Sequence, residues 1–247
     1  MKWFERLDFY RAIREIQTYE RKGSDFCLDP LRFEDLSNVN VKTKLINDLK
    51  DCLEKNTYVP EKLIEIDVPK SNYTLRPGAR PSLVDLIVYT AVTNFIADRV
   101  CKMIPNNSYS FNKFRDNNKK SQYKKPMDYW VDFDNKAREF CDDKRYNYLL
   151  ITDITGFFEH ICIDELNSRL SILSNEDNYL SAVNFLTNTI LMNWTSDNRI
   201  KGFGLPQGPD ASTVLAEIYL YQVDTKLNEN KKIKFLRYMD DFRVFVK

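Results

Sequence analysis

Residues 235–246 read FLRYMDDFRVFV, and this stretch decides the fold of the chain. Two mostly apolar runs enclose the tetrapeptide Tyr238-Met239-Asp240-Asp241, a pattern that predicts a strand, a tight turn and a second strand. Adjacent Asp residues are common in surface turns, because Asp tolerates turn backbone conformations. Taken alone, Asp240 and Asp241 would therefore indicate only a turn.

A third carboxylate follows an earlier apolar run. Residues 148–153 read YLLITD, which is typical of a short buried strand that ends in Asp153. If this strand neighbours the hairpin in one sheet, Asp153, Asp240 and Asp241 converge on one spot. Such a cluster is costly without cations and suits a pair of Mg²⁺ ions, which take oxygen ligands and keep waters for substrate phosphates. Two bound metals can activate a 3′-hydroxyl and stabilise a leaving pyrophosphate, so the pattern indicates phosphoryl transfer.

Helical and extended patterns alternate along the rest of the chain. A first helix is expected to end near Gly23, Pro77, Gly78 and Pro81 are expected to break the chain, and Ser82 caps a helix that reaches about residue 103. A strand is predicted at 63–70, and further helices at 42–55, 130–140, 164–173, 178–194 and 212–228. The order strand, helices, strand, turn, strand fits an α+β fold with an antiparallel sheet and helices on one face.

The composition is that of a globular protein with little net charge. Of the 247 residues, 43% are hydrophobic and 30% are charged, and the net charge is +1. A nucleic acid partner would therefore need a local basic face. Residues 112–126 are such a segment, with six Lys or Arg against one Asp. A solvated loop and a phosphate-binding arm explain this segment equally well.

Cysteine and histidine usage argues against a zinc site. The five cysteines are scattered and His160 is the only histidine, which we expect to be a packed or exposed neighbour and not a catalytic acid. The N-terminus lacks a signal-peptide pattern, and no apolar run approaches the roughly 20 residues that cross a bilayer. We therefore expect a cytoplasmic protein without a membrane partner.

Three blocks of sequence resemble the catalytic motifs of reverse transcriptases, in the same order and at similar spacing. These blocks are DITGFFEHI at 153–161, GLPQGP at 204–209 with Ser212, and YMDD at 238–241. Upstream, Pro69-Lys70 and Arg76-Pro77 are similar to the fingers segment that meets the incoming triphosphate. The resemblance covers roughly residues 60–247, and several blocks in one order are far more specific than a single YxDD.

The resemblance implies a catalytic role for each matching residue of the first and third blocks. Asp153 and Asp240 would be the principal metal ligands, with Asp241 in support, and the backbone carbonyl of Ile154 would complete the metal sphere. Two Mg²⁺ ions are the expected cofactors, and Mn²⁺ could replace them. Phe158 matches the position whose ring blocks a ribose 2′-hydroxyl, so the product would be DNA. Its neighbour Phe157 is expected to be a core residue.

The resemblance also implies contacts with nucleotides and nucleic acid. Gln207 would contact the incoming nucleotide, with Gly208 and Gly204 letting the backbone approach closely. Lys70 and Arg76 would hold the β- and γ-phosphates, whereas Arg80 is better explained as a surface charge. The implied partners are an RNA or DNA template-primer and dNTPs, with an oligomer or a partner subunit as a further expectation.

As a fold, the resemblance implies the fingers and palm of a right-hand polymerase, with a ferredoxin-like palm. We expect an N-terminal helical region at 1–58, fingers at 59–145 and a palm at 146–247. Because the chain stops six residues after Asp241, no thumb is expected, and this fragment alone should be weak or inactive.

The subfamily is suggested by the residues that follow Ser212. The continuation STVLAE at 212–217 resembles abortive-infection and other defence-associated bacterial enzymes, which predicts an RNA-directed DNA polymerase of prokaryotic antiviral defence. A retron or group II intron type enzyme is the alternative, although these more often carry proline where Thr213 stands. A catalytically silent polymerase fold that binds nucleic acid or a partner is the second alternative. An RNA-templated RNA polymerase is the third, and Phe158 argues against it.

Overall fold

The computed structural model describes residues 2–19, 31–69, 73, 75–103, 108–109, 126–195 and 201–247, apart from the side chains of residues 76, 77 and 126–128. Gly23, Lys70 and nearly all of the basic segment 112–126 lie outside the described residues. The chain divides into two compact units. Unit 1 comprises Met1–Ile96 and Cys162–Ser212, and unit 2 comprises Ala97–Ile161 and Thr213–Lys247. The predicted boundaries at 58 and 145 remain a prediction.

Unit 1 is mainly helical, and its helices form where apolar spacing predicts them. Its elements are η1 (Trp3–Arg6), α1 (Phe9–Tyr19), η3 (Asp35–Ser37), α2 (Val39–Glu54), α3 (Leu83–Val100, which continues into unit 2), α6 (Ile163–Ser171), α7 (Asp177–Asn184), η5 (Phe185–Leu191) and α8 (Met192–Trp194). The single helix predicted at 178–194 is interrupted by η5, a π-helical stretch. There the Thr187 hydroxyl donates to the carbonyl of Val183 over 3.0 Å. This bond occupies an acceptor that a regular helix would use.

Unit 1 also contains a two-stranded antiparallel sheet, and one sequence prediction fails there. Strand β1 (Ile64–Pro69) pairs with β2 (Leu75–Arg80), so Pro77 and Gly78 lie inside a strand and do not break the chain. Both strands are edges, where a proline need not donate a ladder hydrogen bond. A Cβ at Gly78 would lie 2.9 Å from Val68 Cγ2, which explains why glycine suits this close pairing.

The start of α3 is capped as predicted. The backbone N–H of Asp85 donates to Ser82 Oγ over 3.3 Å. The Asp85 carboxylate in turn accepts the Tyr58 hydroxyl at 2.6 Å and the Glu61 N–H at 2.8 Å. Burial first, and then the charge of Asp85, raises the pKa of Tyr58, so this phenol stays a donor. The capped helix therefore also fixes the segment that precedes β1.

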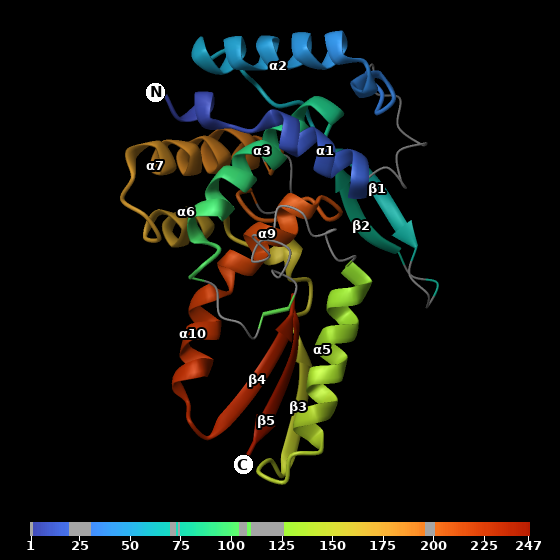
Figure 1. Cartoon of the computed structure of the whole chain (residues 1–247), viewed down its shortest axis with the longest axis vertical. Coiled ribbons are helices and arrows are strands. Elements are labelled where there is room, and N and C mark those ends of the chain that lie inside the picture. Colours follow the sequence, from blue (N-terminus) through green and yellow to red (C-terminus); the bar gives the residue numbers. More distant parts are fainter. Residues whose placement is uncertain are drawn as a thin grey trace. The chain divides into compact units, whose positions relative to one another are not determined.

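Unit 2 is built on a three-stranded antiparallel sheet in the order β3-β5-β4 (Figure 1). The strands are β3 (Tyr148–Asp153), β4 (Ile233–Tyr238) and β5 (Asp241–Val246). The predicted strand–turn–strand is confirmed, and the earlier strand is confirmed as its neighbour. The helices of this unit are α5 (Pro126–Cys141), α9 (Asp210–Tyr219, which begins in unit 1) and α10 (Tyr221–Glu229).

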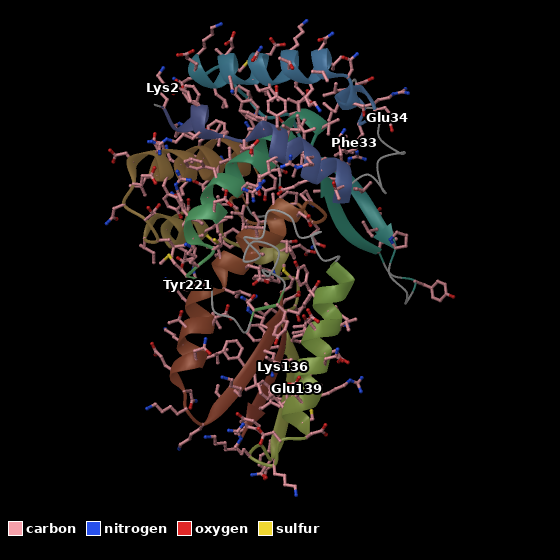
Figure 2. The ribbon with its side chains drawn as sticks, in the orientation of Figure 1. Lys2, Phe33, Glu34, Lys136, Glu139 and Tyr221 are labelled. Carbon is pink, nitrogen blue, oxygen red and sulfur yellow. The ribbon has the colours of Figure 1, made fainter. Side chains whose placement is uncertain are left out.

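Helices cover both faces of this sheet, so the prediction of helices on one face is wrong. On one face, Phe133 and Ala137 of α5 pack in a buried cluster with Leu236 and Phe245. On the opposite face, α10 packs against β4. Figure 1 shows α5 and α10 on either side of the strands. The outer side of α5 is solvated, where Lys136 pairs with Glu139 (Figure 2).

Strand β3 is exposed, whereas the sequence predicted a buried strand. All six of its residues are exposed, including Tyr148 at 73%, Leu150 at 56% and Ile151 at 63%. β3 and β4 are both outer strands of this sheet, but α5 and α10 pack on β4, and among the described elements no helix packs on β3 to a comparable extent. The apolar run at 148–153 therefore forms the expected strand, but this strand is not buried as expected.

Two further findings concern the described cysteines and helices. Cys52, Cys101, Cys141 and Cys162 are free thiols, and Cys27 lies outside the description. Of the described helices, none combines the length and the apolar character needed to cross a bilayer.

Candidate functional site

The three carboxylates singled out in the sequence meet at one end of the unit 2 sheet. In the antiparallel register of β3 and β5, Asp153 stands directly opposite Asp241. The backbone N–H of Ile154 donates to the carbonyl oxygen of Asp240 over 3.2 Å, which ties the end of β3 to the turn. Directly opposed residues have Cβ atoms about 4.5–5.5 Å apart. The fold thus brings these residues together, while their roles as ligands stay a prediction.

The turn that carries Asp240 is conformationally strained. Only Met239 and Asp240 separate β4 from β5, and Met239 has a φ of 56°. A two-residue hairpin turn with positive φ at its first position has the type II′ pattern, which favours glycine there. A methionine in this left-handed region costs roughly 1–2 kcal/mol. Such a conformation persists only where surrounding contacts hold it.

Burial and mutual repulsion raise the pKa of two of the carboxyl groups. For Asp240, burial is the largest cause of the raised pKa, its own backbone N–H opposes it, and the charges of Asp153 and Asp241 add to it. For Asp241, burial again raises the pKa, the guanidinium of Arg243 opposes it, and Asp153 adds to it. Like charges directly opposite each other destabilise a sheet, so folding alone does not favour this arrangement.

The chemistry of these side chains fits divalent cations. Asp241 Oδ1 is buried and has no hydrogen-bond partner among the described atoms, which leaves an oxygen available to an ion. Carboxylate oxygens are the ligands that Mg²⁺ prefers. In the described part of the chain, however, no three acidic, histidine or cysteine side chains are placed as a closed ligand set. Joint ligation therefore requires side-chain rotation, which the exposed Asp153 is free to make.

The predicted sugar-contacting residue lies in a tight turn just after β3. Phe158 begins the short helix η4 (Phe158–His160) and is half-buried, with its ring 5.8 Å from that of Phe157. Phe157 is buried, which confirms it as a core residue. His160 is exposed, and its Nδ1 lies 2.7 Å from the carbonyl oxygen of Gly156. His160 therefore stabilises the turn, and a Cβ at Gly156 would lie 2.9 Å from its ring.

The predicted nucleotide-contacting loop belongs to unit 1. Gly204 and Gly208 have φ values of 105° and 131°, which suit glycine, and Gln207 between them is half-buried. The loop leads into α9, where the Ser212 and Tyr89 hydroxyls form a buried hydrogen bond of 3.0 Å. This bond fixes the first turn of α9 and hence the end of the loop.

The predicted phosphate contacts fall at the edge of what the structure describes. Lys70 lies outside the described residues. The backbone of Arg76 lies in β2 opposite Val68, and its side chain is not described. Arg80 ends β2 and is half-buried. Their contacts with phosphate therefore remain predictions.

Sequence reasoning missed a buried charged group beside the turn. Arg237, Glu217 and Asp224 are each fully buried, and Arg237 forms an ion pair with each of the two carboxylates. The signal was present, because Arg237 interrupts an apolar strand and Glu217 lies among apolar residues of α9. A charge in such surroundings must be paired to be buried.

The α+β unit thus gathers carboxylates at one end of its strands, and carboxylate oxygens are ligands that divalent cations prefer. Residues 68–247 match the family described as reverse transcriptase (RNA-dependent DNA polymerase), which is most of the chain. The protein belongs to the reverse transcriptase family.

Two solved structures similar to this chain are described as a partial Cas6-RT-Cas1--Cas2 complex and a Cas6-RT-Cas1--Cas2 complex. Both are 21% identical in sequence and cover 97% of this chain, with a TM-score of 0.45. The chain spans 36% of the first and 23% of the second. No protein with a curated description matches the sequence.

Proposed function

We propose that the protein is an RNA-directed DNA polymerase that adds dNTPs to a 3′-hydroxyl, with Asp153, Asp240 and Asp241 holding two Mg²⁺ ions. The observation that carries the proposal is the cross-strand pair of Asp153 and Asp241, with Asp240 tied to Ile154 beside it. Membership of the reverse transcriptase family over residues 68–247 supports the same chemistry. Mn²⁺ would be an acceptable substitute for Mg²⁺.

The carboxylates would act by position and charge. When bound, the ions would lower the barrier to attack by the 3′-hydroxyl and neutralise charge on the leaving pyrophosphate. Asp153 ends β3 and Asp240 lies in the turn between β4 and β5, so the two carboxylates would hold the ions from different segments of the chain. Asp241, with its unpartnered Oδ1, would support them, and the carbonyl of Ile154 would be a further oxygen ligand. The 3′-hydroxyl would release its proton to solvent, so no side chain needs to act as a general base in this scheme.

Selection of the nucleotide would fall to residues outside the carboxylate cluster. The half-buried ring of Phe158 would exclude a ribose 2′-hydroxyl by overlap, which makes the product DNA. Gln207 and Gly208 would contact the incoming nucleotide, and Lys70 and Arg76 would pair with its β- and γ-phosphates. Phe158→Ala is therefore expected to admit ribonucleotides, as a primer-extension assay with NTPs would show.

The deciding experiment compares carboxylate substitutions in primer extension by the full-length protein. Asp240→Asn and Asp153→Asn should each abolish DNA synthesis, because they keep side-chain shape and remove a ligand charge. Asp143→Asn is a matched control, since Asp143 pairs with Arg145 in the turn before β3, at the opposite end of the sheet. Full synthesis by Asp240→Asn would refute the proposed site.

The proposal extends to the architecture and the biological role of the enzyme. The α+β unit that carries the carboxylates would be the palm and the β1–β2 hairpin part of the fingers. The continuation after Ser212 supports a bacterial enzyme of antiviral defence, acting in the cytoplasm on an RNA or DNA template-primer. A retron or group II intron type enzyme remains the alternative. The exposed apolar strand β3 supports association with a partner subunit or another copy.

A catalytically silent scaffold is the second candidate, and one observation favours it. The described side chains do not form a closed metal-ligand set. The two functions separate in a titration of thermal stability with Mg²⁺, because a silent scaffold gains no stability from the ion whereas an enzyme with this site does.

A further inference from the structure

Arg237 is held by more partners than its place in a strand requires. Its Nε donates to Asp224 Oδ1 over 2.8 Å and its Nη2 to Asp224 Oδ2. The same Nη2 lies 2.9 Å from Glu217 Oε2, which also accepts the hydroxyl of Ser108. The guanidinium plane lies over the ring of Phe242, 5.8 Å from its centroid. Each contact fixes the direction in which the fork of N–H groups points.

The remaining arm of this guanidinium reaches the turn. Nη1 of Arg237 donates to the backbone carbonyl oxygen of Met239 over 2.8 Å. Met239 is the residue with a φ of 56°, and it immediately precedes Asp240. Because the left-handed conformation is unfavourable for methionine, the carbonyl of this residue needs an external donor to stay in place. Arg237 supplies that donor from a buried position.

The charges around Arg237 make its orientation costly to change. Two buried carboxylates face one buried guanidinium. If Arg237 turned away, no solvent would be present to replace its ion pair with Asp224 or its ion pair with Glu217. Burial alone would lower the pKa of Arg237, but the charge of Glu217 and the hydrogen bonds to Asp224 outweigh it and raise the pKa. The group therefore stays charged and fixed beside the turn.

The main chain of Arg237 is anchored as well. Its carbonyl oxygen accepts the N–H of Tyr109 at 2.9 Å, and Ser108 forms a β-bridge with it. Side chain and backbone are thus both tied to elements other than the hairpin: α9, α10 and residues 108–109. Such a fixed donor can impose a geometry on a neighbouring turn, which a solvent-exposed arginine could not do.

We infer that Arg237 is a positioning residue for the carboxylate turn: held by Glu217 and Asp224, it fixes the Met239 carbonyl and so sets where Asp240 presents its carboxylate. This inference rests on the proposed polymerase function. It extends that function, because the buried charged side chains of Arg237, Glu217 and Asp224 then contribute to catalysis as well as to stability. Arg237 itself touches neither substrate nor metal.

The test is a double-mutant cycle between Arg237→Lys and Met239→Gly. Lysine keeps the positive charge between the two carboxylates but lacks the planar fork that reaches Met239 at the same time. Glycine adopts the left-handed conformation without strain, so it removes the need for the Arg237 donor. Each of the four proteins is measured for kcat, for KM of dNTP, and for the Mg²⁺ concentration that gives half of the ion's thermal stabilisation.

The expected result is strong coupling between the two positions. In the Met239 background, Arg237→Lys should lower kcat by about tenfold or more, because misplacing a catalytic group by ~1 Å costs on the order of 10²-fold. The half-saturating Mg²⁺ concentration should rise several-fold, while KM for dNTP changes by less than about twofold. In the Met239→Gly background, the same substitution should lower kcat by only about twofold.

A merely structural role would give a different pattern. The change in kcat of the double variant would then equal the product of the two single changes to within about twofold. That outcome would overturn the inference. Phe245→Leu serves as the matched control, because Phe245 is buried in the same sheet but lies in β5 away from the turn. It should lower the unfolding temperature and leave the Mg²⁺ requirement unchanged.

Two further arms keep the outcome interpretable. If Arg237→Lys fails to fold, Asp224→Asn replaces it in the cycle, because it loosens Arg237 and keeps an acceptor for Nε; additive effects with Met239→Gly would again overturn the inference. Asp240→Asn is assayed in parallel. Full activity in Asp240→Asn contradicts the proposed function, whereas loss there with normal kcat and Mg²⁺ requirement in Arg237→Lys contradicts only the positioning role.

Discussion

Strands β3 and β4 flank the same central strand, β5. The more apolar of the two, β3, is the more exposed. β3 reads YLLITD and is exposed at every residue. β4 reads IKFLRY, carries two basic residues, and buries Phe235, Leu236 and Arg237. Cover decides this difference, because α5 and α10 both pack on β4. The more apolar strand is therefore the one that lacks cover.

The comparison separates two ways of placing a carboxylate. Asp153 is placed by the register of an exposed strand and by the hydrogen bond from the Ile154 N–H to the Asp240 carbonyl, with no buried side chain behind it among those described. Asp240 is placed by a strained turn. The buried Arg237, itself paired with Glu217 and Asp224, stabilises this turn through its hydrogen bond to the Met239 carbonyl. We therefore expect substitutions around β4 to change both stability and catalysis, and substitutions within the apolar part of β3 to change neither by much.

The largest expected effect is that of Arg237→Leu. This substitution leaves Asp224 and Glu217 buried without their common partner, which should lower the free energy of unfolding by about 3–5 kcal/mol. Urea unfolding monitored by circular dichroism would measure the loss. A loss below about 1 kcal/mol would mean that the cluster is hydrated in solution and that β4 is not covered as described.

A smaller effect of opposite sign is expected for Asp240→Asn in metal-free protein. The folded-state pKa of Asp240 is raised, so its contribution to stability is greatest below the unfolded pKa of about 3.9 and is lost as pH rises through the folded pKa. At neutral pH the neutral amide should therefore stabilise the metal-free protein, by at most about 1 kcal/mol after solvent screening.

The pH dependence provides the check on that prediction. Thermal unfolding in the presence of a chelator should show the advantage of Asp240→Asn at pH 7 and its disappearance near pH 4. An advantage that stayed constant across this range would show that repulsion among the carboxylates is not its cause. The Asp143→Asn variant should show no such pattern, because Arg145 lowers the pKa of Asp143 and so stabilises its charged form.

The smallest effect is expected in β3. Ile151→Thr keeps a β-branched side chain and removes apolar surface from a residue that is 63% exposed, so the free energy of unfolding should change by less than about 0.5 kcal/mol. Urea unfolding of the purified protein measures it. A loss above about 1 kcal/mol would show that another copy or a partner covers β3 in solution.

The sequence predicted the hairpin and the earlier strand, because alternation and turn chemistry are local signals. The meeting of the three Asp residues depended on these strands being neighbours, which the resemblance to reverse transcriptases implied. It did not predict the exposure of β3, since burial depends on what packs against a strand and not on the strand itself. It also misjudged Pro77 and Gly78, because an edge strand tolerates residues that a central strand excludes.

The contacts of Arg237 were beyond sequence reasoning for a related reason. Glu217 and Asp224 lie 20 and 13 residues from Arg237 along the chain, and only the packing of α9 and α10 on β4 brings them to it. An isolated charge inside an apolar run signals that partners exist, but it does not identify them. The positive φ of Met239 was similarly hidden, because a methionine gives no sign of it.

The most direct test of the account is whether Asp153, which ends β3, shares an ion with the turn that β4 supports. Thermal unfolding of the protein and of Asp153→Asn would be followed across a Mg²⁺ titration. The account predicts that Mg²⁺ stabilises the unsubstituted protein, by about 2.7 kcal/mol at a concentration 100 times the dissociation constant, and that Asp153→Asn loses most of this gain. Equal stabilisation of both proteins would contradict it.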